Sequence, residues 1–237
     1  MLYYILYNQN LTPEEAVIHF LITIAVFMIS LTVHEFAHAF SAYKMGDPTA
    51  KLAGRMTLNP FKHLNLFGFI MFMLLGVGWA KPVPINPLNF KKYKKGTRWV
   101  SISGVLANFV LAVFAAIIFV VLSLTVGIGG NLMFWIYYIL IYLIIINGFL
   151  LMFNILPIPP LDGFNFVTSF MKSENKFIKF MARNGAKLLI GIILISLIAD
   201  LLFGFDILSF YLSLFSEVIF RIISLNSSAF AVLSAFF

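Results

Sequence analysis

Long apolar runs separated by short polar segments dominate the chain. The first run, residues 16 to 43, contains neither Pro nor Gly and follows a helix-start signal in which Thr12 is the cap. Further apolar runs cover residues 100 to 126, 132 to 155 and 188 to 203. Runs of this length and character predict helices that cross a membrane.

Two other apolar stretches are ambiguous. Residues 64 to 80 are interrupted by glycines, are followed by prolines and have basic residues on both sides. This predicts a re-entrant element of irregular or edge-strand backbone, with a short tilted span as the alternative. Residues 207 to 237 form either a last span or a helix lying in the interface. We expect an all-α polytopic membrane protein of about five to six transmembrane helices, with a re-entrant or β-hairpin element between the first two core spans.

Composition supports a membrane location. Hydrophobic residues make up 62% of the chain and charged residues only 11%, and the mean hydropathy is +1.01. The absence of cysteine excludes disulfides and thiolate metal ligands, so that His, Asp and Glu remain as ligands. We expect one membrane-embedded domain over residues 1 to 237, with a core at 16 to 165 and C-terminal helices at 186 to 237.

The net charge of +7 reflects topology. Of the 16 Lys and Arg residues, all except Arg221 fall within residues 44 to 62, 81 to 98 and 172 to 187. Basic loops beside apolar spans face the cytoplasm, so these three segments are predicted to be cytoplasmic. We therefore expect the lipid bilayer, and no nucleic acid, as a partner.

The chemistry-bearing motif is His34-Glu35-Phe36-Ala37-His38, within the first predicted helix. Residues four apart share a helix face, so both imidazoles point the same way, as a zinc site requires. The neighbouring carboxylate is suited to act as general base. Ionisable groups at membrane depth cost several kcal/mol unless they are paired or bound, which favours a functional site over a structural role.

A third ligand must come from elsewhere in the chain. His19 lies fifteen residues earlier on the same helix, about 22 Å away, and cannot reach. Asp162 follows the span that returns to the side where the motif histidines lie, and it is the favoured ligand. Asp162-Gly163 is also a common turn dipeptide. Glu174 is the alternative ligand, although its lysine neighbours indicate a solvated charge.

Four motifs of the chain belong together, namely His34-Glu35-Phe36-Ala37-His38, Gly78-Trp79-Ala80-Lys81-Pro82-Val83-Pro84, Ser103-Gly104-x-x-Ala107-Asn108 and Asn154-x-x-Pro157-x-Pro159-x-x-Asp162-Gly163. In combination they resemble the site-2 protease family of intramembrane zinc metalloproteases, peptidase family M50. The resemblance extends over residues 16 to 165, and the chain looks like a minimal form without an inserted PDZ-like domain or a CBS pair.

The resemblance implies a zinc metalloprotease that holds one Zn²⁺ per chain. It assigns His34, His38 and Asp162 as the zinc ligands and Glu35 as the general base. It also implies that Asn154, and with it Asn108, holds the substrate or the oxyanion.

The same resemblance implies where the substrate binds. Residues 66 to 84 match a membrane-embedded β-hairpin that receives an unwound substrate as an added strand. The expected partner is a membrane protein with a transmembrane segment. The expected location is the plasma membrane of a prokaryotic cell, with the active site near the cytoplasmic side.

The sequence thus predicts an intramembrane endopeptidase that cuts within or near a transmembrane segment, in regulated intramembrane proteolysis. The alternatives are a metal-binding membrane transporter and a non-catalytic scaffold of the same fold. A transporter would spread its ligands along several spans, whereas here they gather at one end. An intact Glu35 argues against a scaffold.

Overall fold

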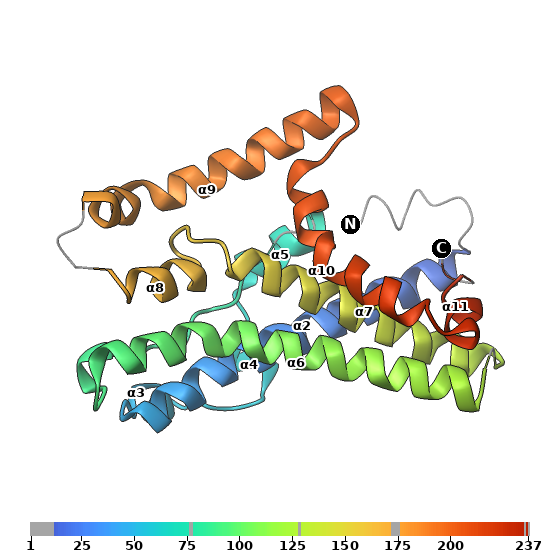
Figure 1. Cartoon of the computed structure of the whole chain (residues 1–237), viewed down its shortest axis with the longest axis horizontal. Helices are drawn as coiled ribbons and strands as arrows, with labels where there is room; N and C mark the ends of the chain where they lie inside the picture. The colour runs from blue at the N-terminus through green and yellow to red at the C-terminus, as the bar shows by residue number, and fades with distance from the viewer. Residues whose placement is uncertain (1–11, 76–77, 128, 172–175, 235, 237) are drawn as a thin grey trace.

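The computed structural model describes residues 12–75, 78–127, 129–171, 176–234 and 236. These residues are mostly helical, and no strand occurs among them (Figure 1). The helices are α2 (Pro13–Met45), α3 (Thr49–Leu52), α4 (Pro60–His63), α5 (Leu66–Leu75), the 3-10 helix η1 (Pro87–Asn89), α6 (Tyr93–Thr125), α7 (Asn131–Asn154), α8 (Asp162–Thr168), α9 (Lys176–Phe203), α10 (Ile207–Ile223) and α11 (Ser227–Leu233).

Helices α2, α6 and α7 lie side by side and form the core, α10 packs along α7, and α9 lies apart (Figure 1). Within the described residues, 4 helices are long and apolar enough to cross a membrane, namely α2, α6, α7 and α9. The protein is therefore an integral membrane protein. The stretch from residue 207 divides into α10, which has 17 residues, and the shorter α11.

Both ends of α2 follow the predicted signals. Thr12 and Glu15 form a capping box, in which the Thr12 N–H donates to Glu15 Oε2 at 2.9 Å and the Glu15 N–H donates to Thr12 Oγ1 at 3.3 Å. At the other end Gly46 adopts a left-handed φ of 112°, which favours glycine. A Cβ on Gly46 would also lie 3.0 Å from the Asn89 carbonyl oxygen, so the glycine lets η1 approach the helix end.

Helix α6 begins seven residues before the predicted start at residue 100. Its first turns contain Lys94, Lys95 and Arg98, residue types that favour helix and can extend their charged ends into water. Arg98 also binds the end of α8, with its guanidinium 3.8 Å from the Phe170 ring centroid and its Nε–H donating to Ser169 Oγ at 3.3 Å. The last part of the predicted basic segment at 81 to 98, from Tyr93 onward, is therefore helix.

The expected β-hairpin at residues 66 to 84 is not present in the described residues. Leu66–Leu75 forms helix α5, because half of its residues are Leu or Met, which favour helix, and Ile70 is its sole β-branched residue. The side chain of Asn65 accepts from the Gly68 N–H at 2.9 Å in the first turn. Ten residues span about 15 Å, too short to cross a bilayer. Residues 78–86 continue as extended chain, while 76 and 77 lie outside the described residues.

A buried carboxylate fixes this extended chain to the end of α2. Asp47 is fully buried; its Oδ2 accepts from the Asn86 N–H at 2.7 Å, and its Oδ1 accepts from Asn89 Nδ2 at 2.8 Å. Thr49 donates both its N–H and its hydroxyl to the same Oδ1. Burial alone would raise the pKa of Asp47, but these hydrogen bonds outweigh it and hold the pKa below its ordinary value.

Replacing Asp47 by Ala should lower the free energy of unfolding by about 3 kcal/mol, because buried donors lose a charged acceptor. Thermal unfolding of the purified protein in detergent measures this, with Asp200→Ala on an exposed position of α9 as the control. A lowered folded-state pKa stabilises above the unfolded pKa and ceases to do so as the pH falls through the folded value. The difference between wild type and Asp47→Ala should therefore be full at neutral pH and shrink below a pH of about 3.9. An unchanged transition would contradict the anchoring role.

Candidate metal centre and active site

His34 and His38 lie on the face of α2 that contacts α6. Both are buried, with exposed fractions of 5% and 6%. Gly104 of α6 lies directly against them, because a Cβ there would be 2.4 Å from His38 Nε2 and 2.6 Å from His34 Cε1. Only a residue without a side chain leaves room for two imidazoles between these helices. Sequence reasoning noted Gly104 in a motif but missed this role.

Asp162 reaches the histidines from the segment that follows α7. That helix ends at Asn154, and the prolines at 157, 159 and 160 prevent it from continuing. Gly163 then packs against the end of α7, where an added Cβ would lie 2.1 Å from the Ile155 carbonyl oxygen. The close turn places Asp162 at the first position of α8, with its carboxylate toward α2. The Asp-Gly pair thus combines a candidate ligand with a required turn.

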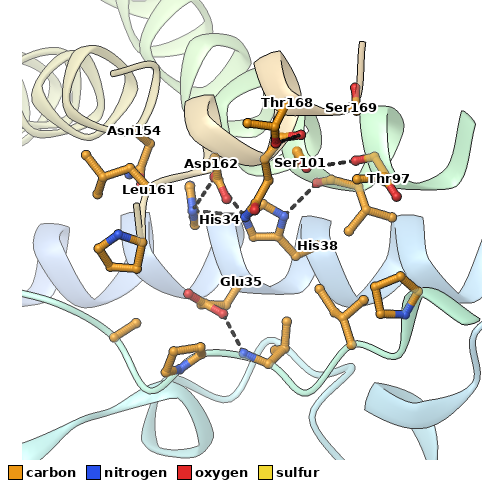
Figure 2. Close-up of a pocket in the computed structure, with 18 of the residues that line it drawn as sticks. His34, Glu35, His38, Thr97, Ser101, Asn154, Leu161, Asp162, Thr168 and Ser169 are labelled. Atoms are coloured by element: carbon orange, nitrogen blue, oxygen red, sulfur yellow. Dashed lines mark hydrogen bonds and ion pairs between the residues drawn. The ribbon is translucent and has the colours of Figure 1, made fainter. Parts of the chain in front are cut away.

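The three candidate ligand atoms converge on one point (Figure 2). Asp162 Oδ2 lies 3.3 Å from His34 Nε2 and 3.0 Å from His38 Nε2, and the two Nε2 atoms are 3.1 Å apart. Ligand atoms about 2.0–2.1 Å from a tetrahedral zinc lie about 3.3 Å from one another. The observed triangle is therefore close to one face of such a tetrahedron.

Hydrogen bonding on the far side of each imidazole supports a cation site. His38 Nδ1 lies 2.8 Å from the Val100 carbonyl oxygen, which can only accept, so Nδ1 carries the proton and Nε2 presents a lone pair. Asn108 places its amide oxygen 2.6 Å from His34 Nδ1. Asp162 Oδ2 is buried without a hydrogen-bond partner. Three lone pairs directed at one point repel unless a cation lies between them, and two His with one Asp suit zinc.

Glu35 lies on the adjacent face of α2 and is directed toward the extended segment (Figure 2). Its Oε2 accepts from the Val83 N–H at 2.9 Å, and its exposed fraction is 9%. Val83 stands between Pro82 and Pro84, so its N–H is the sole backbone donor of those three residues. The Pro-Val-Pro sequence therefore presents one donor, and that donor orients the Glu35 carboxylate beside the histidines.

A cavity of about 1060 Å³ opens beside these residues. Its walls come from α2, the extended segment, the start of α6, the end of α7 and α8, and most of its lining is apolar. The lining includes His34, Glu35, His38 and Asp162, which are therefore accessible from one space. A cavity of this size accommodates a stretch of peptide next to the candidate metal centre.

The structure separates the two asparagines that the resemblance assigned to substrate. Asn154 lines the cavity, and its Nδ2 donates to the Leu150 carbonyl at 2.9 Å. Asn108 does not line the cavity: it is fully buried on the far side of His34. Its position does not fit contact with a substrate or an oxyanion, because the His34 ring stands between it and the cavity.

The other titratable candidates lie elsewhere. The His19 ring packs on Tyr138 with centroids 4.1 Å apart, away from His34 and His38 on the same helix. Glu174 falls outside the described residues. In the part of the chain that the structure describes, His34, His38 and Asp162 form the one group of His, Asp and Glu side chains that could hold a metal ion.

Comparison with known proteins points in the same direction. The protein named "Putative zinc metalloprotease YwhC" of Bacillus subtilis is 40% identical over 149 residues, which cover 59% of this chain and 64% of that protein. "Putative zinc metalloprotease Rip2" of Mycolicibacterium smegmatis is 30% identical over 199 residues, which cover 79% of this chain and 72% of that protein. The chain thus matches slightly less than two thirds of the length of YwhC.

The family match includes the motif helix. The sequence profile of peptidase family M50 matches residues 22–133, which contain His34, Glu35, His38 and Gly104. No solved structure matches the chain. The extended match to Rip2, together with the family match, shows that this chain belongs to peptidase family M50.

Proposed function

We propose that the protein is an intramembrane zinc metalloendopeptidase that hydrolyses a peptide bond within or near the cytoplasmic end of a transmembrane segment. The observation that carries this proposal is the convergence of His34 Nε2, His38 Nε2 and Asp162 Oδ2 within 3.0–3.3 Å, with Glu35 on the same turn of α2. Relatives named as zinc metalloproteases support the same chemistry.

His34, His38 and Asp162 would hold one zinc ion. A zinc ion held there would polarise a peptide carbonyl and lower the pKa of a nearby water. Glu35 accepts the proton of the attacking water and then delivers it to the departing amide nitrogen. Its hydrogen bond from the Val83 N–H keeps the carboxylate oriented for the first of these steps.

The depth of the site determines the class of substrate. His38 lies seven residues before the end of α2 at Met45, about 10 Å along the helix axis. A soluble chain would have to enter the bilayer to reach it, whereas a transmembrane segment is already at this depth. Such a segment must unwind before cleavage, because its carbonyls are hydrogen-bonded within the helix.

The extended segment at residues 78–86 forms one wall of the cavity and is where an unwound substrate would lie. Within Pro82–Pro84 its carbonyl oxygens can accept hydrogen bonds, while its one N–H already donates to Glu35. The substrate must therefore donate its own N–H groups to this part of the wall. A substrate proline facing it would bind poorly.

The distribution of Lys and Arg indicates how the protein is oriented in the membrane. The segments at 44 to 62 and 81 to 98 lie at the end of the bundle that carries the site, and both are rich in Lys and Arg. By the positive-inside rule this end faces the cytoplasm, in the plasma membrane of a prokaryotic cell. Water then reaches the cavity from the cytoplasmic side.

The test is to map cleavage sites. Membrane-protein fragments should be identified by mass spectrometry from cells that produce the wild type or Glu35→Gln. We expect fragments specific to the wild type, cut in the cytoplasmic third of transmembrane segments. Cuts confined to extramembrane loops, or the same fragments from both proteins, would contradict the proposal. Because the native chain has no cysteine, labelling of Lys94→Cys from each side fixes the orientation independently.

A further inference from the structure

A chain of fully buried polar side chains extends from His34 into the core, away from the cavity. Asn108 on α6, Asn147 on α7 and Ser30 on α2 each have an exposed fraction of 0%. Asn147 and Ser30 line no part of the cavity and contact no candidate ligand atom. Buried amides between apolar helices are costly unless every hydrogen bond is made. The partners of each amide therefore determine which of its terminal atoms is the nitrogen and which is the oxygen.

The Leu143 carbonyl oxygen, which can only accept, determines the orientation of the Asn147 amide. It lies 2.8 Å from one terminal atom of the Asn147 amide, so that atom must be the NH₂ group. The same group donates to Ser30 Oγ at 2.8 Å, which uses its second hydrogen. The other terminal atom of Asn147 is therefore the oxygen, an acceptor.

This acceptor determines the orientation of Asn108. Asn147 Oδ1 lies 2.7 Å from the Asn108 amide, so the atom of Asn108 that faces it must be Nδ2. The Ser30 carbonyl oxygen, 3.5 Å from the same atom, favours the same assignment. A flipped Asn108 would set its oxygen against both of these oxygens.

The orientation of Asn108 in turn determines the proton of His34. Asn108 Oδ1 faces His34 Nδ1 at 2.6 Å and can only accept, so Nδ1 must carry the hydrogen. His34 Nε2 then presents its lone pair toward Asp162 and His38. The Val100 carbonyl fixes the hydrogen of His38 on Nδ1 directly. His34 Nδ1 instead faces a side chain, Asn108, and among the described residues no backbone acceptor bonds to it.

We propose that Asn147 is a positioning residue for the metal centre: acting through Asn108, it fixes the hydrogen of His34 on Nδ1 and keeps Nε2 free to bind the ion. The inference rests on the proposed zinc site. Leu143, a backbone acceptor on α7, thereby determines the state of an imidazole on α2. Partners of this kind around metal ligands typically change metal affinity by 10–100-fold.

The test compares the zinc affinity of purified wild type and Asn147→Leu by competition with a chromophoric chelator. We expect roughly 10–100-fold weaker binding in the variant. In Asn147→Asp a neutral carboxyl keeps one O–H donor and one carbonyl acceptor in place, so this variant should restore most of the affinity. Ser123→Ala is the matched control, since Ser123 is buried on α6 and donates only to Val120 O of its own helix.

Nitrogen-15 NMR of histidine in the zinc-free protein gives the second measurement and requires no variant. Wild-type His34 should be protonated on Nδ1, and Asn147→Leu should shift it toward the Nε2–H form. A His34 Nδ1 without a hydrogen in the wild type, or equal zinc affinity and the same Nδ1 protonation in wild type and Asn147→Leu, would overturn this inference. Failure of the wild type to bind zinc at all would instead refute the proposed metal site.

Discussion

Glu35→Gln should reduce peptide hydrolysis by at least about 10³-fold while zinc content stays at the wild-type level. The substitution leaves His34, His38 and Asp162 unchanged. The Gln amide oxygen can still accept from the Val83 N–H, which lies 2.9 Å from Glu35 Oε2, so the local structure is retained. What is lost is the group that takes a proton from water and returns it to the amine, because an amide has no accessible basic site.

The measurement pairs a cleavage assay with metal analysis of the same preparations. Glu217→Gln makes the same chemical change on an exposed position of α10 and serves as the control for loss of a carboxylate. Cleavage by Glu35→Gln at a rate comparable to the control would remove Glu35 from the proposed mechanism. Loss of zinc along with activity would instead assign Glu35 a role in holding the site together.

The long helices were predictable because the bilayer leaves few choices. An apolar run of twenty or more residues must satisfy its backbone internally, so α2, α6 and α7 lie close to their predicted ranges. The start of α6 was not predictable from hydrophobicity, since its first turns carry Lys and Arg. The stretch at 64 to 80 was ambiguous because short apolar runs with glycine fit helix, strand or loop equally well.

The candidate site was predictable to the extent that it is local in sequence. His34, Glu35 and His38 share one helix, and helix periodicity alone sets the two imidazoles on one face. Asp162 could be proposed because topology brings the end of the returning span to the same depth. The structure brings these four residues together at one cavity.

What sequence reasoning missed depends on contacts between helices or on backbone atoms. The Val100 carbonyl and the Val83 N–H hold His38 and Glu35, yet a backbone group carries no residue-type signature. Asn108 was assigned to the substrate because its motif gave no indication of which way it faces. That direction depends on the rotation of α6 against α2, which no local pattern specifies.

Because α6 is rotated so that Gly104 faces the two histidines of α2, Gly104 is the position of α6 at which a substitution should disturb the metal centre most. Gly104→Ala adds a Cβ that would lie 2.4 Å from His38 Nε2 and 2.6 Å from His34 Cε1, closer than nonbonded atoms approach. Either the imidazoles turn away from Asp162 or α2 and α6 separate, and in both cases the 3.0–3.3 Å triangle of ligand atoms opens.

We therefore expect Gly104→Ala to lose zinc together with activity, in contrast to Glu35→Gln, which should lose activity alone. Zinc affinity and peptide cleavage should each fall by at least about 10²-fold, as expected when ligand geometry is disturbed. Gly191→Ala is the matched control: Gly191 lies within α9, and an added Cβ there has no atom within 4 Å. The control should bind zinc normally and be slightly more stable, because Ala favours helix over Gly by about 1 kcal/mol. If Gly104→Ala bound zinc as tightly as this control, the close packing of α6 against the two histidines could not be what shapes the metal centre.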